Sequence, residues 1–308
     1  MSFLSYLENK YTVSSSGGQL KLSGMCPFCL TDRQDLRLYI DPKKGVGICF
    51  HCSQGFNAIR FVMAAEGVSW RVALGILNED EEFVAMVKDE PDETQIPWPT
   101  LEELENHPAA VDYLEGRGID LTMAGKLNMK FAPFDMQWQG KTYPTGGRIV
   151  TPIYDITGNP VAWQGRHIGK SKIKYFTAPG FDKASHLFNA NAIQPGTPFL
   201  ILVEGIYDLM GWYRAGFKRA VASLGKFVSE EQVQVLRYLR PGVLFLALDV
   251  DASWQQHEFV EKHGYCFADV RLIKLAKDAD EMGKADLFKA IEIAKPYSWE
   301  SKVLAELS

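Results

Sequence analysis

Apolar residues along the chain fall into short runs whose spacing predicts both strands and helices. The run Phe199–Val203 is continuously apolar, as is typical of a strand buried on both faces of a parallel sheet. Apolar residues then recur at helical spacing as far as Gly216, where we expect the helix to end. Runs at 243–248 and 269–275 predict two more strands of this kind, so the region from residue 198 onward is predicted to be an α/β domain.

The preceding hundred residues show a different pattern. Residues 109–120 have helical spacing that is broken between Gly116 and Gly118, and residues 147–168 predict a hairpin that turns at 157–159. This mixture predicts an α+β subdomain rather than a continuation of the parallel sheet.

Charge is unevenly distributed and indicates where the domains meet. Residues 79–105 contain eleven acidic residues and one lysine, whereas residues 112–186 contain ten Lys or Arg and six Asp or Glu. We expect an acidic linker between an N-terminal module and a locally basic core. The predicted division is an N-terminal module at 1–78, the linker at 79–100, the α+β subdomain at 101–197 and the α/β domain at 198–308.

Composition narrows the class of protein. The 308 residues are 46% hydrophobic and 23% charged, which is ordinary for a globular protein. The net charge of −5 does not favour a protein that coats nucleic acid through an overall basic surface. The apolar runs are too short to span a membrane, and the N-terminus lacks the pattern of a secretory signal. Five cysteines in such a chain predict a reducing, cytoplasmic environment rather than disulfides.

Four of these cysteines form two CxxC pairs, Cys26/Cys29 and Cys49/Cys52, separated by nineteen residues. This spacing is typical of a structural zinc site, in which four thiolates surround one ion. Strand-like segments at 36–41 and 45–50 lie between and around the pairs, so the module is predicted to be a zinc ribbon. Its aromatic and basic residues suit single-stranded nucleic acid. Equally, the aromatic residues fit the core of a small module and the lysines fit a solvated turn.

Carboxylates follow each of the three predicted parallel strands. Glu204 follows the first strand, Asp249 and Asp251 the second, and Asp278 and Asp280 the third. Because the carboxyl ends of parallel strands meet at one edge of a sheet, these acids are expected to gather there. Oxygen ligands without nearby His or Cys favour Mg²⁺, with Mn²⁺ as a substitute, and such ions assist phosphoryl transfer.

These motifs resemble a known family. Residues 203–208 (VEGIYD), 247–253 (ALDVDAS) and 277–281 (KDADE) resemble the Toprim domain, a fold shared by bacterial-type primases, topoisomerases and some nucleases. The order of motifs in residues 109–188, together with the zinc module, resembles the DnaG-type primases of bacteria and phages. The resemblance implies a small zinc ribbon, a mixed α+β RNA-polymerase-like subdomain and an α/β Toprim domain with a mainly parallel sheet.

The resemblance also implies roles for individual residues and partners. Glu204, Asp249 and Asp251 correspond to the catalytic metal-binding acids. Arg148, Arg166, Lys174 and Tyr175 correspond to nucleotide- or template-binding positions. The implied activity is that of a DNA primase, which makes short RNA primers on single-stranded DNA from ribonucleoside triphosphates during replication in the bacterial cytoplasm. The family includes both bacterial and phage-encoded members. A separate replicative helicase is the expected partner.

Two other functions remain open on the sequence alone. A Toprim nuclease uses the same acids without needing ribonucleotides. A non-catalytic, zinc-dependent binder of single-stranded DNA needs the ribbon but not the acids. Cleavage of DNA would identify the first, and binding without synthesis would identify the second.

Overall fold

The structure, a computed structural model, describes residues 3–16, 19–23, 26–29, 38–41, 45–50, 54–79, 96–249 and 252–297. The chain divides into two compact units. The first comprises Met1–Asp92 with the short segments Ile193–Thr197 and Val233–Pro241, and the second comprises the remaining residues. The four-part division expected from the sequence stays a prediction. Within the described residues, every helix is too short or too polar to cross a membrane.

An antiparallel meander forms the centre of the first unit, with its five strands in chain order. The ribbon strands expected at 36–41 and 45–50 are present as β3 and β4. The β1–β2 hairpin was not predicted, because its serine-rich first strand lacks an apolar alternation. The strands are β1 (Thr12–Ser16), β2 (Gln19–Ser23), β3 (Leu38–Asp41), β4 (Val46–Cys49) and β5 (Gly55–Asn57).

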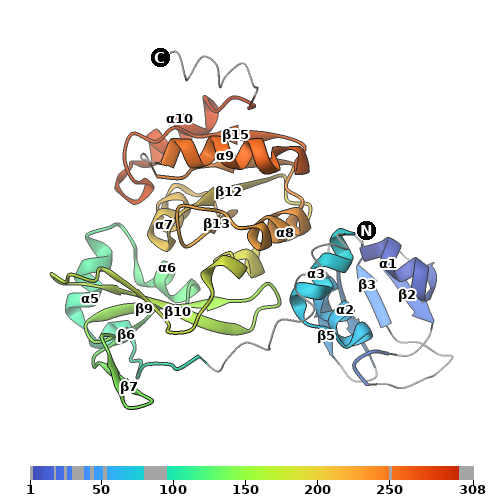
Figure 1. The fold of residues 1–308 in the computed structure, drawn as a ribbon, viewed down its shortest axis with the longest axis horizontal. Coiled ribbons are helices and arrows are strands. Elements are labelled where there is room, and N and C mark those ends of the chain that lie inside the picture. The colour runs from blue at the N-terminus through green and yellow to red at the C-terminus, as the bar shows by residue number, and fades with distance from the viewer. Residues whose placement is uncertain are drawn as a thin grey trace. The chain divides into compact units, whose positions relative to one another are not determined.

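Helices α1, α2 and α3 also belong to this unit (Figure 1). Asn57 caps α2 by accepting a hydrogen bond from the Arg60 backbone N–H, and Gly67 ends the helix in a left-handed conformation. The Phe61 ring is fully buried and lies 5.1 Å from the Phe56 ring, centroid to centroid, so α2 packs against the sheet through aromatic contacts. The helices are α1 (Phe3–Lys10), α2 (Ala58–Glu66) and α3 (Trp70–Asn78).

The second unit contains an antiparallel sheet in the order β11-β10-β9-β6. The predicted hairpin is confirmed, since β9 and β10 pair in antiparallel register. Trp163 on β10 is fully buried in the core. The strands are β6 (Lys130–Ala132), β9 (Arg148–Tyr154), β10 (Pro160–His167) and β11 (Tyr175–Thr177), with a separate hairpin of β7 (Met136–Trp138) and β8 (Lys141–Tyr143). The helices of this part are η1 (Leu104–Asn106), α5 (Pro108–Glu115), α6 (Leu121–Lys126), η2 (Lys183–Ser185) and η3 (Ala190–Ala192).

The other sheet of this unit is parallel, as predicted, with the order β13-β12-β14-β15. The chain runs from β12 to β13 on one side and then returns to β14 on the other side of β12. Open α/β sheets bind ligands at the carboxyl ends of strands where the order reverses in this way. The strands are β12 (Phe199–Val203), β13 (Ala220–Ala222), β14 (Val243–Leu246) and β15 (Val270–Leu272). The helices of this part are α7 (Ile206–Ala215), α9 (Ser253–His263), η5 (Gly264–Cys266), η6 (Ala279–Glu281) and α10 (Lys284–Glu292). Helix α8 (Glu230–Leu239) begins in this unit, but most of it falls in the segment Val233–Pro241 of the first unit.

Candidate functional site

Three cysteine thiols of the first unit come together as the sequence predicts. The sulfurs of Cys26, Cys29 and Cys49 all lie within 4.8 Å of one another. Burial raises the pKa of the Cys26 thiol to about 12, so a neighbouring cation is needed to hold it as a thiolate. Thiols this close fit zinc, whose bonds to sulfur are about 2.3 Å long. The fourth expected ligand, Cys52, lies outside the described residues.

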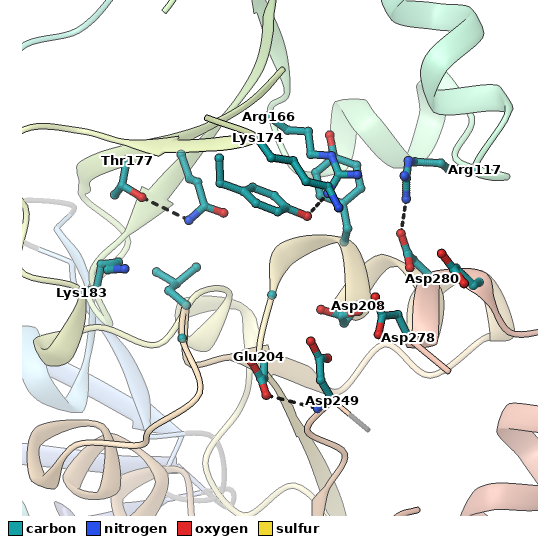
Figure 2. A pocket seen from close by; sticks show the side chains of 17 residues that line it. Arg117, Arg166, Lys174, Thr177, Lys183, Glu204, Asp208, Asp249, Asp278 and Asp280 are labelled. Atoms are coloured by element: carbon teal, nitrogen blue, oxygen red, sulfur yellow. Dashed lines mark hydrogen bonds and ion pairs between the residues drawn. The ribbon is translucent and has the colours of Figure 1, made fainter. Parts of the chain in front are cut away.

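The carboxylates of the second unit gather at the edge of the parallel sheet where its strands have their C-terminal ends. Together with cations from the antiparallel part they line a cavity of about 380 Å³, which we call the acidic pocket (Figure 2). Asp251, expected to lie beside Asp249, falls outside the described residues. The acids that line the pocket are Glu204, Asp208, Asp249, Asp278, Asp280 and Glu281.

Glu204 and Asp249 are held close to each other by the ends of adjacent strands. β12 and β14 pair in parallel, so the residues that follow them leave the same edge of the sheet. The Glu204 Oε1 atom accepts a hydrogen bond of 3.3 Å from the Asp249 backbone N–H. Glu204 is only 8% exposed, and a carboxylate this buried requires compensating positive charge.

Asp208 is a further acid of the pocket, on the first turn of α7. Its pKa is raised from 3.8 to about 8, mainly by burial and also by the negative charges of Asp249, Asp280, Asp278 and Glu204. A carboxyl group in this position is protonated near neutral pH unless a cation is present. The site therefore has more negative charge than its own side chains balance, and its oxygen-only ligands fit Mg²⁺.

Cations from the antiparallel part of the unit face these acids across the pocket (Figure 2). Arg166 on β10 and Lys174 immediately before β11 both line the cavity, as expected, and so does Tyr175. Arg166 Nη1 donates to the Tyr175 hydroxyl, and its guanidinium lies 4.6 Å from the centre of that ring. The pocket therefore presents acids on one side and cations on the other.

Arg148, expected to contact nucleotide or template, lies elsewhere. Its side chain is fully buried, and it does not line the acidic pocket. The guanidinium donates to the backbone carbonyls of Pro144 at 2.6 Å, Ile173 at 2.8 Å and Lys174 at 3.1 Å. This geometry favours a structural role, in which Arg148 anchors the segment that carries Lys174 rather than contacting a ligand itself.

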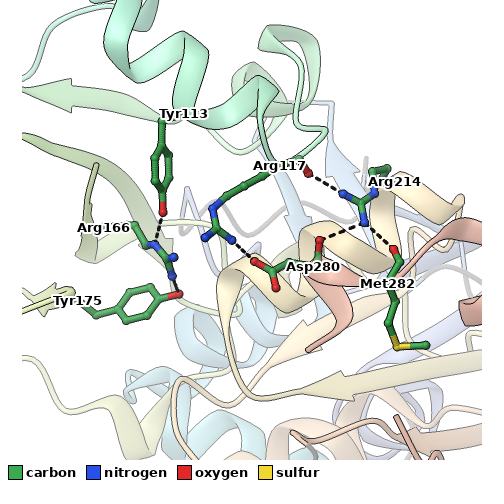
Figure 3. A network of polar contacts seen from close by, with 7 residues as sticks. All are labelled: Tyr113, Arg117, Arg166, Tyr175, Arg214, Asp280 and Met282. Carbon is green, nitrogen blue, oxygen red and sulfur yellow. Dashed lines mark hydrogen bonds and ion pairs between the residues drawn. The ribbon is translucent and has the colours of Figure 1, made fainter. Parts of the chain in front are cut away.

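Arg117 is a functional candidate that the sequence did not reveal. It follows α5 and forms an ion pair with Asp280, 163 residues further along the chain (Figure 3). Its guanidinium lies 5.1 Å from the centre of the Tyr113 ring and 5.6 Å from that of Tyr207. A single arginine in a glycine-rich turn carries no sequence signal for such a distant contact.

A second hollow, which we call the basic groove, adjoins the acidic pocket and shares three of its residues: Arg117, Arg166 and Lys174. Its volume is about 650 Å³. No acidic side chain lines it among the described residues. The groove is lined by Tyr113, Arg117, Arg166, His167, Gly169, Lys170, Ser171, Lys172 and Lys174.

Known proteins resemble this chain in both sequence and fold. Residues 5–93 match the DnaG zinc-ribbon family described as the CHC2 zinc finger. A DNA primase of Pseudomonas aeruginosa is 28% identical over an alignment 362 positions long, covering 94% of this chain and 54% of that protein. One from Aquifex aeolicus is 28% identical over 266 residues, covering 74% of this chain and 53% of that protein. The chain thus spans about half the length of the curated relatives it matches.

Solved structures show the same fold. The crystal structure of the zinc-binding and RNA polymerase domains of the Aquifex aeolicus primase matches with a TM-score of 0.55 and 21% identity, covering 96% of this chain and 84% of that one. A DnaG primase catalytic domain bound to single-stranded DNA matches with a TM-score of 0.51 and 23% identity, covering 61% of this chain and 74% of that one. The predicted combination of a zinc ribbon, a mixed α+β part and a parallel Toprim-like sheet is therefore confirmed.

Proposed function

Because the chain resembles the DnaG-type primases in sequence and in fold, we propose that it is a DNA primase. In this proposal it polymerises ribonucleoside triphosphates into short RNA on a single-stranded DNA template. The observation that supports it most directly is the acidic pocket, where carboxylates of a parallel sheet face cations of a second sheet. A nuclease would use the same acids, but it would leave the resemblance of the chain to primases unexplained.

The acids of the pocket are the proposed magnesium ligands. The expected ligands are Glu204, Asp249, Asp251, Asp278 and Asp280. When bound there, Mg²⁺ supplies the positive charge that neutralises the triphosphate and the attacking 3′-oxygen. Glu204 and Asp249 would fix its position because the ends of two paired strands orient them.

The cations opposite the acids are the proposed contacts for the triphosphate. Arg166 presents a planar guanidinium that its tyrosine partners hold in place, since Nε donates to Tyr113 at 2.5 Å. A guanidinium fixed in this way suits phosphate oxygens, which it can contact in pairs. Lys174 is exposed beside it and supplies a mobile charge. Together these side chains would hold and orient the phosphates before the transfer.

The basic groove is the proposed path of the template. It is continuous with the acidic pocket through Arg117, Arg166 and Lys174, and Lys170 and Lys172 add charge further along. The structural match to a primase domain bound to single-stranded DNA supports this assignment. The ribbon offers a second contact, because Phe50 is 55% exposed and Lys21 lies 4.9 Å from the centre of the Tyr39 ring.

Synthesis of RNA by the purified protein tests this proposal. The assay supplies Mg²⁺, four labelled ribonucleotides and single-stranded DNA of mixed sequence. We expect short RNA from the wild type and a loss of about 100-fold or more in Asp249→Asn, because a metal ligand is removed. Asp269→Asn is the matched control, since Asp269 pairs with Arg271 at the far end of β15 and should leave synthesis within about twofold. Cleaved DNA without RNA would instead identify a nuclease, and binding without either product would identify a non-catalytic binder.

A further inference from the structure

The ion pair between Arg117 and Asp280 divides the acids of the pocket into two kinds. Asp280 has an arginine as its direct partner, and its side chain is only 9% exposed. Asp278, two residues earlier, is exposed and has no ion pair within the part of the chain that the structure describes. The two aspartates of this motif therefore differ in how free they are to bind a metal.

Arg117 is fixed in place from several sides, so the pair is not a chance surface contact. Its guanidinium lies against the rings of Tyr113 and Tyr207, and Tyr207 is buried. Its backbone carbonyl accepts a hydrogen bond of 2.6 Å from Arg214 Nη1 (Figure 3). Because contacts hold both its backbone and its guanidinium, Arg117 loses little additional conformational freedom when it pairs with Asp280.

Arg214 ties the same two segments together at the level of the backbone. Its Nη2 atom donates to the carbonyls of Asp280 at 3.1 Å and Met282 at 2.6 Å. Gly118 has φ of +68°, and a Cβ there would lie 2.9 Å from the Arg214 Cδ atom, so only glycine lets the turn approach this closely. The end of α5 and the segment η6 are therefore joined by both side-chain and backbone contacts.

We propose that Arg117 withholds Asp280 from the metal and that Asp280 is a positioning residue. In this account, magnesium is held by Asp278 together with Glu204 and Asp249, while Asp280 fixes the segment that carries Asp278. The inference rests on the proposed metal site and refines it, because the resemblance places both aspartates of the motif among the metal-site acids.

Titration of Mg²⁺ by calorimetry into the full, zinc-loaded chain tests this proposal. The decisive comparison is between Asp278→Asn and the double variant Arg117→Gln/Asp280→Asn. The double variant removes one charge of each sign, so the net charge of the pocket is unchanged and only the ligand set is altered. We expect Asp278→Asn to weaken binding at least tenfold. The double variant should stay within threefold of the wild type, because Arg214 still holds the segment that carries Asp278 through the backbone carbonyls of Asp280 and Met282.

The single variant Arg117→Gln gives an independent readout. It frees the Asp280 carboxylate without removing it, so we expect Mg²⁺ to bind several-fold more tightly. Unchanged or weaker binding in Arg117→Gln would contradict the proposal, as would a double variant that loses affinity to the extent of Asp278→Asn. Absence of Mg²⁺ binding in the wild type would instead overturn the metal site on which the proposed function depends.

Thermal unfolding provides a second measurement that does not depend on affinity. Arg117→Gln, Asp280→Asn and their combination form a double-mutant cycle, which reports the coupling between the two side chains. We expect the coupling to persist at saturating Mg²⁺, because the ion pair remains intact beside the bound metal. Loss of the coupling when Mg²⁺ is added would show that the metal recruits Asp280.

Discussion

Asp208 is the residue whose ionisation the pocket alters most clearly. Its carboxyl group has a pKa of 3.8 when unperturbed and about 8 in the folded protein, mainly because of burial. Between these values the folded protein keeps a proton that the unfolded chain has lost. The free energy of unfolding therefore falls as pH rises through this range, by at most about 1.4 kcal/mol per pH unit.

This reasoning predicts that Asp208→Asn makes stability less dependent on pH. In magnesium-free buffer, urea unfolding at several pH values between 5 and 8 should give a smaller decline for the variant than for the wild type. The variant should also be the more stable protein near pH 8, because it no longer loses a proton on unfolding. The same decline in both proteins would contradict the raised pKa of Asp208.

Arg148 is a second residue whose burial has a testable consequence. Its guanidinium satisfies several backbone carbonyls in the interior, so Arg148→Met should destabilise the protein by about 3 kcal/mol or more. The exposed Arg219 lies over the ring of Phe199 and is a suitable control, for which we expect a change of about 0.5 kcal/mol in Arg219→Met. Chemical denaturation measures both. Equal stability of the two variants would contradict this structural role of Arg148.

Sequence and structure agree least at the residue scale, for a physical reason. Glu204, Asp249 and Asp278 were predicted because each follows an apolar strand, a signal that is local in the chain. Arg117 was missed because its partner is 163 residues away, and the burial of Arg148 could not be read from its neighbours. Contacts of this kind depend on how the two sheets of the unit are packed.

At the scale of elements, helix α7 links the first acidic motif to the third. It begins two residues after Glu204, and its Gly211 faces the backbone of η6, where an added Cβ would lie 2.3 Å from the Ala279 carbonyl oxygen. A helix can approach another backbone this closely only through glycine. The position of Asp278 and Asp280 thus depends on the surface of α7.

We therefore predict that Gly211→Ala destabilises the protein by about 2 kcal/mol or more and weakens Mg²⁺ binding, because η6 must move away. Gly125 in α6 is the matched control, since a Cβ there meets nothing within 4 Å. Gly125→Ala should be neutral or stabilising by up to about 1 kcal/mol through its higher helix propensity. Denaturation and calorimetric titration check both variants, and intact metal binding in Gly211→Ala would contradict the packing argument.

The elements themselves follow the sequence closely where apolar patterns are strong. The strands β12, β14 and β15 and the helix ending at Gly216 lie where their apolar runs predict them. Short strands such as β1 and β7 were not predicted, because their pairing partners rather than their own residues define them.

At the scale of the whole molecule, two metals are expected to act separately. The zinc ligands lie in the first unit and the acids in the second. We predict that atomic absorption will find one bound zinc per chain. Cys49→Ser should lose this zinc, and its first unit should unfold more readily, because structural zinc contributes directly to folding. Cys266→Ser should retain the zinc, because Cys266 lies in η5 of the second unit. Retention of zinc in Cys49→Ser would contradict the predicted ligand set.

The central claim is that the acids and the cations of the acidic pocket act on one nucleotide. The most direct test is the Mg²⁺-dependent binding of ATP, measured by calorimetry for the wild type, Asp249→Asn and Lys174→Met. We predict that either substitution weakens binding about tenfold or more, because each removes one side of the same site. Lys170→Met, which changes only the basic groove, should bind ATP as the wild type does. ATP binding that survives both pocket substitutions, or that needs no Mg²⁺, would contradict the account.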